Sequence, residues 1–181
     1  MGLYQWLYCT FTRRHFNQNL NFKSFYKAKK FLLILPDSLI RTIDILPGLA
    51  GLIKGHQNVA VSLIIPEDQK FIFNSLYSER IQKIFYPGSL KISNAVFKRL
   101  KSRLAENDFD ILVDLTDKPN RAFAYLARAR YRLNLNNHKF FPYYNVVYKT
   151  TDLSRIFFLW CKTFPNAVSL FPVNKEQKSA I

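Results

Sequence analysis

Apolar and polar positions alternate along residues 31–165 in blocks that predict strands separated by helices. Continuous apolar runs are typical of strands that are covered on both faces of a parallel sheet. A run with strict alternation is typical of a half-buried strand. The segments read as strands are FLLIL (31–35), VAVSLII (59–65), IQKIFY (81–86), ILVDL (111–115) and a further strand near 131–135.

Helices are predicted between these strands. In segment 91–107 apolar residues recur every four positions, which predicts one buried face and one exposed face. A second helix is predicted to follow Pro36, Asp37 and Ser38, and others over 119–130 and 151–164. Strands that alternate with helices indicate right-handed crossovers. The sequence therefore predicts an α/β fold, a three-layer Rossmann-like domain with a mostly parallel sheet.

Composition divides the chain into a basic, aromatic N-terminal arm (1–30), the Rossmann-like domain (31–165) and a C-terminal tail (166–181). The arm contains no acidic residue. If its start is helical, apolar side chains share one face and two arginines follow them, an arrangement that suits a membrane interface, a protein groove or RNA. A helix folded back on the core is the alternative. The predicted anchor residues are Leu3, Trp6, Leu7, Phe11, Arg13 and Arg14.

The net charge of +15, from 27 basic and 12 acidic side chains, favours an anionic partner. Nucleic acid, an anionic membrane face and an acidic protein surface all fit. No apolar run approaches the roughly 20 residues of a membrane-spanning helix. We therefore expect a cytoplasmic protein, or one peripheral on the inner face of the membrane. Cys9 and Cys161 match no metal-binding spacing, so we expect no metal and no cofactor.

Ligands of parallel α/β sheets bind at the carboxyl ends of the strands. The first loop at that edge, residues 35–41, has no glycine, which disfavours a dinucleotide site and a P-loop. Asp37 in this loop is read mainly as a helix N-cap and only weakly as a catalytic residue. Asp114, near the end of an apolar strand, is read as a structural carboxylate that bonds loop amides.

The helix predicted after residue 119 carries the candidate binding surface. Arg121, Tyr125, Arg128 and Arg132 follow one another at spacings of four, three and four, which predicts a basic stripe with an aromatic ring inside it. Such a stripe can grip phosphates and stack on a base. Lys98 and Lys101 on the preceding helix are expected to extend it. A solvated helix face is the alternative interpretation.

Two stretches carry a resemblance to a known family. FDILVDL followed by RAFAYLARARYRLNL, and KKFLLILPDSLIRTIDILPGLAGLIKG with Pro47, resemble the N-terminal domain of glycosyltransferase family nine, the ADP-heptose:lipopolysaccharide heptosyltransferases. The resemblance covers roughly residues 29–150. It implies one half of the two-domain GT-B architecture, in which the other domain holds most of the sugar nucleotide.

The chain departs from that family in the first loop. Family members have a Gly-Asp pair there, whose carboxylate is the catalytic base, while this chain has Ile40 and Arg41. A guanidinium stays protonated and cannot accept the proton. The chain also ends where the second domain would begin, so we expect a degenerate relative and do not expect a sugar nucleotide as ligand.

These observations favour a non-catalytic binding protein or accessory subunit of a larger assembly, with a protein as its main partner. An anionic membrane surface or RNA are further partners that the charge permits. One alternative is a heptosyltransferase-like enzyme of lipopolysaccharide or surface-glycan synthesis. A second alternative is a binder of RNA or of ribonucleoproteins.

Overall fold

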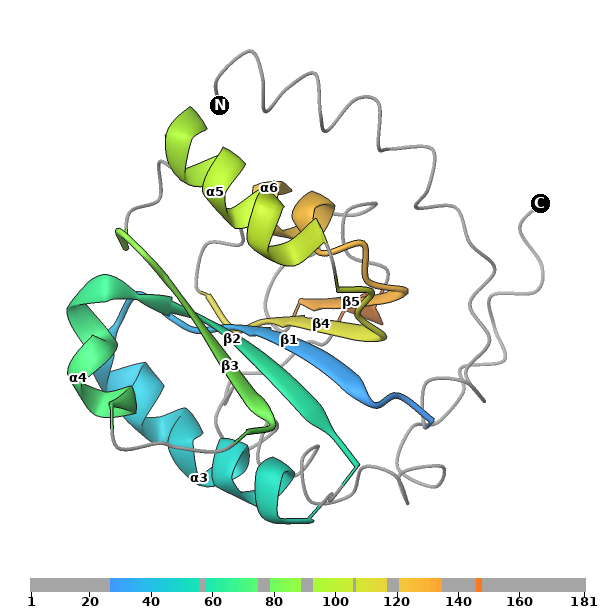
Figure 1. Cartoon of the computed structure of the whole chain (residues 1–181). Coiled ribbons are helices and arrows are strands. Elements are labelled where there is room, and N and C mark those ends of the chain that lie inside the picture. The colour runs from blue at the N-terminus through green and yellow to red at the C-terminus, as the bar shows by residue number, and fades with distance from the viewer. Residues whose placement is uncertain are drawn as a thin grey trace.

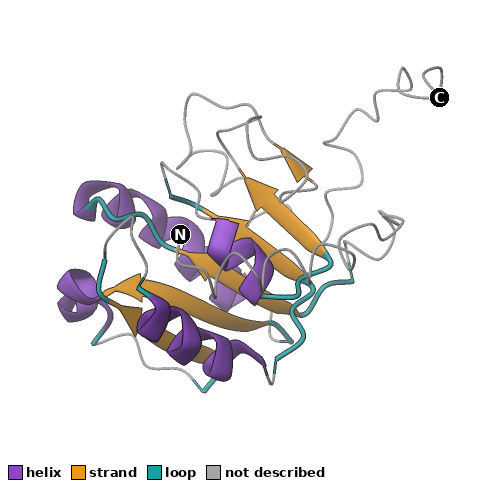
Figure 2. Ribbon diagram, turned by 90° about the horizontal axis from the view of Figure 1, so that it is seen from above, coloured by secondary structure: helices purple, strands orange, loops and turns teal. Residues whose placement is uncertain are grey.

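The computed structural model describes residues 27–55, 58–74, 79–88, 93–105, 107–116, 121–134 and 146–147. Within these residues the strands form a single six-stranded sheet in the order β3-β2-β1-β4-β5-β6. Each neighbouring pair is parallel, which confirms the expected α/β Rossmann-like fold (Figure 2). The strands are β1 (Lys30–Ile34), β2 (Ala60–Pro66), β3 (Ile81–Tyr86), β4 (Ile111–Asp114), β5 (Tyr131–Asn134) and β6 (Val146–Val147).

Helices cover both faces of the sheet (Figure 1). They are α3 (Leu39–Gly55), the 3-10 turn η2 (Glu67–Gln69), α4 (Lys70–Phe73), α5 (Asn94–Ala105) and α6 (Arg121–Leu126). Because successive side chains of a strand point to opposite faces, Phe31 and Leu33 of β1 join the core under α3 and α4, while Leu32 and Ile34 join the core under α5 and α6. The sheet is therefore the middle layer of three.

The topology fixes where a ligand is expected. Chain order along the sheet reverses beside β1, with β2 on one side of it and β4 on the other. In doubly wound folds this switch point opens a crevice at the carboxyl ends of the strands. The loops that follow β1, β2 and β4 therefore surround the expected site.

One predicted element is wrong in its extent. The helix expected over 119–130 ends at Leu126, and Arg128 adopts a left-handed conformation with φ of 42°. A residue in that conformation ends an α-helix. The helix expected over 91–107 is found as α5, and β1 begins at Lys30, the last residue of the predicted arm.

Several predictions lie outside the described residues. They are the arm up to residue 26, the helix expected over 151–164 and the tail 166–181. In the part of the chain that the structure describes, no helix combines the length and the apolar character needed to cross a bilayer.

Candidate functional site

At the carboxyl edge of the sheet, the first loop is fixed by a side chain from η2, the turn that follows β2. Gln69 is 1% exposed, and its Nε2 donates hydrogen bonds to the carbonyl oxygens of Pro36 and Asp37, both at 2.9 Å. Thr42 Oγ1 donates a third bond to Pro36 O at 3.3 Å. A loop without glycine is thereby held in place by side-chain donors to its carbonyls.

Asp37 forms a pair with the tyrosine that ends β3. The Tyr86 hydroxyl donates to Asp37 Oδ1 at 2.8 Å. Burial raises the pKa of Tyr86 far above its ordinary value of 10, and the hydrogen bond to Asp37 adds to the rise. The phenol therefore stays protonated at neutral pH and remains a donor.

The expected N-cap role of Asp37 is wrong. The residue before the first residue of α3 is Ser38, whose carbonyl accepts the first helical bond from Thr42 N at 3.0 Å. Asp37 lies one position earlier, and its carboxylate reaches Tyr86 instead. The cause is the neighbouring strand, which supplies a donor that the local sequence pattern does not include.

Asp114, at the end of β4, has the structural contacts that the sequence predicted. It is 1% exposed, and its Oδ1 accepts bonds from Thr116 N at 3.0 Å and from Thr116 Oγ1 at 2.5 Å. These bonds fix the turn that leaves β4. They also place another carboxylate at the carboxyl edge, beside β1.

The carboxyl edge is consequently rich in acidic groups. Acidic side chains follow or end each of the strands β1, β2 and β4, namely Asp37, Glu67, Asp68 and Asp114. Glu67 lies 3.7 Å from Arg99 Nη2, and both side chains are about half exposed. The exposed Arg41 is in the first turn of α3. Carboxylates at this edge disfavour the phosphates of a nucleotide.

The amino edge of the sheet is organised differently. Lys30, Asp110 and Arg130 lie side by side at the starts of the neighbouring strands β1, β4 and β5. Each directly precedes one of the residues Phe31, Ile111 and Tyr131, which are in register. Asp110 N donates to Lys30 O at 2.9 Å, and Tyr131 N donates to Asp110 O at 3.0 Å. Asp110 Oδ2 accepts the backbone N–H groups of Lys29 at 2.8 Å and of Lys30 at 3.0 Å.

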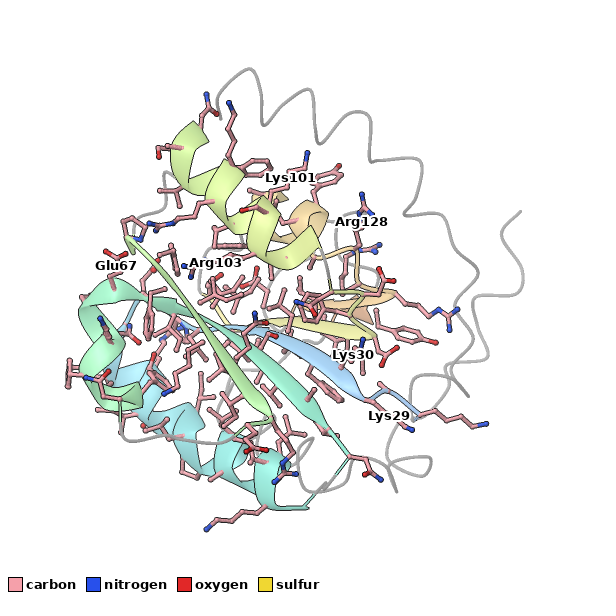
Figure 3. The ribbon with its side chains drawn as sticks, viewed as in Figure 1. Lys29, Lys30, Glu67, Lys101, Arg103 and Arg128 are labelled. Atoms are coloured by element: carbon pink, nitrogen blue, oxygen red, sulfur yellow. The ribbon has the colours of Figure 1, made fainter. Side chains whose placement is uncertain are left out.

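Exposed basic side chains gather at this amino edge. We call them the amino-edge cluster: Lys27, Lys29, Lys30, Arg128 and Arg130. Figure 3 shows Lys29 and Lys30 where β1 begins, and Arg128 beside the connection between α6 and β5. The exposed Asp108 and the half-buried Asp110 are the acidic residues among them.

The predicted stripe on the helix after 119 does not form. Tyr125 and Arg132 are each 3% exposed, and Arg132 lies on β5, where its Nη1 donates to Ala129 O at 2.8 Å. The early end of α6 is the physical reason, because a four-three-four spacing gives one face only while the helix continues. Arg128 is exposed, and Arg121 is the first residue of α6.

The remaining predicted binding residues are on α5, which packs on the same face of the sheet as α6 (Figure 1). Lys98 is exposed and Lys101 is half-buried. The predicted N-terminal anchor residues lie outside the described residues. Sequence patterns gave no signal for Gln69, Tyr86 or Asp110, whose partners are 33, 49 and 81 positions away along the chain.

Comparison with known proteins gives a likeness of fold. No family model matches the sequence, and no curated protein sequence matches it. A structure search finds the crystal structure of the glycosyl transferase family 9 from Veillonella parvula DSM 2008, with a TM-score of 0.55 and 19% sequence identity. The match covers 78% of this chain and 41% of that chain. The chain therefore has a glycosyltransferase-family-9-like fold and matches less than half the length of that protein.

Proposed function

We propose that the chain is a non-catalytic binding protein that contacts an anionic partner through a basic surface. The observation that carries this proposal is the placement of charge on the sheet. Acidic groups surround the carboxyl edge, where ligands of this fold normally bind, and the amino-edge cluster lies at the opposite end of the strands. The exposed cations of the second edge attract an anion, and the carboxylates of the first edge oppose its binding there.

The lack of a proton acceptor supports the non-catalytic part of the proposal. In the family that the sequence resembles, the first loop supplies a carboxylate base, and Arg41 stands at the matching position. Asp37 is the remaining carboxylate of that loop, and its Oδ1 already accepts the Tyr86 hydroxyl. A carboxylate that accepts a hydrogen bond is a weaker base for a substrate hydroxyl.

The rigid core supports a role as a platform in a larger assembly. The central strands β1, β2 and β4 are buried on both faces, and the loop after β1 is fixed by Gln69. A scaffold of this kind can present charged side chains at set positions. We therefore place the chain as an accessory subunit with a protein partner, whose contact includes anionic groups.

The test is purification of the full chain with its native partners at low salt. We expect a partner to co-purify and its affinity to fall by roughly tenfold or more between about 50 and 200 mM salt. Identification of the partner by mass spectrometry, with lipid and nucleic-acid analysis, gives its chemical class. Partner recovery that is insensitive to salt would contradict an electrostatic contact.

The second candidate is a glycosyltransferase, favoured by the likeness of fold to a family 9 enzyme. In that case Asp37, exposed at the carboxyl edge, is the group to test. Turnover of a sugar nucleotide by the wild type, lost in Asp37→Asn and kept in Asp44→Asn, would replace the first proposal with this one. Asp44 is the matched control because it is an exposed carboxylate further along α3.

A further inference from the structure

We infer that the amino-edge cluster docks the chain on an anionic phospholipid surface. This inference rests on the proposed function and names the anionic surface that its basic side chains contact, which is a separate contact from the one with the protein partner. It also separates the binding surface from the carboxyl edge, where the fold would place a small ligand.

The cluster has the shape of a row. It lies at the starts of three adjacent parallel strands, β1, β4 and β5, in which Phe31, Ile111 and Tyr131 lie in register. Adjacent strands are about 4.8 Å apart, so the cations at the starts of β1 and β5 lie about two strand spacings apart, on either side of the start of β4 with Asp108 and Asp110. A row of this kind presents its charges together to a planar surface.

Asp110, in the middle of the row, offsets one of the cluster's positive charges but does not bind the lysine side chains through its Oδ2. Its Oδ2 is directed at the backbone N–H groups of Lys29 and Lys30. The side chains of both lysines are exposed. The carboxylate thus binds the backbone at the start of β1, and the side chains of Lys29 and Lys30 remain exposed to solvent.

The backbone conformation of Arg128 is an independent indication that its side chain has a role in binding. Its φ of 42° lies in the left-handed region, where glycine is the residue that causes least strain. Among the described residues, it is the non-glycine residue with a positive φ. A residue that accepts backbone strain and exposes its charge points to a role in binding rather than in folding.

Two observations favour lipid over single-stranded RNA. Binding of single strands relies on exposed rings that stack on bases, and the aromatic residues nearest the row, Phe31, Phe109 and Tyr131, are at most 5% exposed. The chain also continues from Lys27 into residues 1–26, whose sequence includes Trp6, Arg13 and Arg14 and no acidic residue. Aromatic and basic residues together are typical of segments at a membrane interface.

The experiment is co-sedimentation of the full chain with vesicles of phosphatidylglycerol and phosphatidylcholine, compared with vesicles of phosphatidylcholine alone. The double variant Lys30→Gln/Arg128→Gly removes two charges from the cluster. We expect its affinity for the anionic vesicles to fall by roughly 30-fold, from about 1 kcal/mol for each cation. The control Arg41→Gln/Lys70→Gln removes two exposed charges elsewhere, and we expect less than about a threefold change. Thermal melting checks that both variants are folded.

The outcomes separate this inference from the proposed function. Equal losses in both variants would show attraction by net charge alone and would overturn the docking surface. Salt-sensitive binding of an RNA oligonucleotide without binding of anionic vesicles would overturn the lipid partner and leave the proposed function standing. Binding to neither probe, together with no salt-sensitive partner in the purification, would overturn both.

Discussion

At the carboxyl edge of the sheet, Asp37 and Asp114 accept hydrogen bonds from the hydroxyl groups of Tyr86 and Thr116. At the amino edge, Asp110 accepts hydrogen bonds from backbone N–H groups, and the basic side chains around it are exposed. Both edges use carboxylates to fix loops. They differ in the balance of exposed charges. The carboxyl edge combines exposed carboxylates with Arg41 and Arg99, and the amino edge has the five basic residues of the amino-edge cluster with Asp108.

The difference shows that a fold and its usual binding site can be separated. Parallel α/β domains place anionic cofactors at the carboxyl ends of their strands with the help of glycine-rich loops. Here the corresponding loop has no glycine and is fixed by the side chains of Gln69 and Thr42. The scaffold is kept, and the exposed basic cluster lies at the edge where those cofactors do not bind.

The largest expected effect is at the carboxyl edge, in the variant Gln69→Met. Met fills a similar volume but leaves the carbonyls of Pro36 and Asp37 without the two bonds from Nε2. Loss of buried hydrogen-bond donors should lower the free energy of unfolding by about 2–3 kcal/mol, measured by urea denaturation. Affinity for anionic vesicles should not change, because the amino edge is untouched.

The matched control for that variant is Gln82→Met. Gln82 is exposed and accepts a bond from Ser62 Oγ at 3.0 Å. We expect a loss below about 1 kcal/mol, since solvent can replace this bond. Equal losses in both variants would mean that the loop after β1 does not depend on Gln69.

The pair of Tyr86 and Asp37 is expected to give a pH-dependent effect. Tyr86→Phe should cost about 1.5 kcal/mol at neutral pH, because a hydrogen bond to a carboxylate is lost. The pKa of Tyr86 in the folded chain is raised above its ordinary value of 10. The stability that this shift represents is present below pH 10 and is lost as pH rises above it, by about 1.4 kcal/mol per pH unit.

Urea denaturation of both proteins at pH 8 and at about pH 11 tests the sign. The wild type should lose its advantage over Tyr86→Phe as pH rises, because only the wild type has this phenol to ionise on unfolding. The other tyrosines and the lysines are common to both proteins and cancel in the difference. A difference that stays constant with pH would show that burial does not perturb this tyrosine.

The strands could be read from the sequence because their apolar runs report burial locally. VAVSLII and ILVDL contain nearly all of β2 and β4. The end of α6 could not be read, since no glycine or proline marks it and Arg128 takes the left-handed conformation that glycine usually takes. The sequence spacing therefore predicts an exposed face for Tyr125 and Arg132, although both are buried in the structure.

The site was harder to predict than the fold for a related reason. Gln69, Tyr86 and Asp110 act through partners that are distant in sequence and adjacent in the sheet. Periodicity and spacing describe neighbours along the chain. The strand order shows which loops meet at each edge of the sheet, and therefore which acidic and basic side chains lie near one another.

A smaller effect is expected from Asp110→Asn at the amino edge. The amide oxygen still accepts from the N–H groups of Lys29 and Lys30, but without charge, so stability should fall by about 1 kcal/mol. Removal of one negative charge should raise affinity for anionic vesicles by roughly fivefold. The control Asp108→Asn, at an exposed neighbour, should raise affinity to a similar degree with little change in stability. A lower affinity in both variants would exclude attraction at this edge.

The smallest expected effect separates strain from binding at Arg128. Arg128→Gly should raise the free energy of unfolding by at most about 1 kcal/mol, because glycine adopts a φ of 42° without strain. The control Arg130→Gly changes an exposed arginine two positions later, where no positive φ is found, and should lower stability by about 0.5–1 kcal/mol. If Arg128→Gly is more stable than the wild type but binds anionic vesicles less tightly, the arginine is retained for its charge at the expense of the fold. If it is instead less stable, the Arg128 side chain stabilises the end of α6, and its conformation is no sign of a binding role.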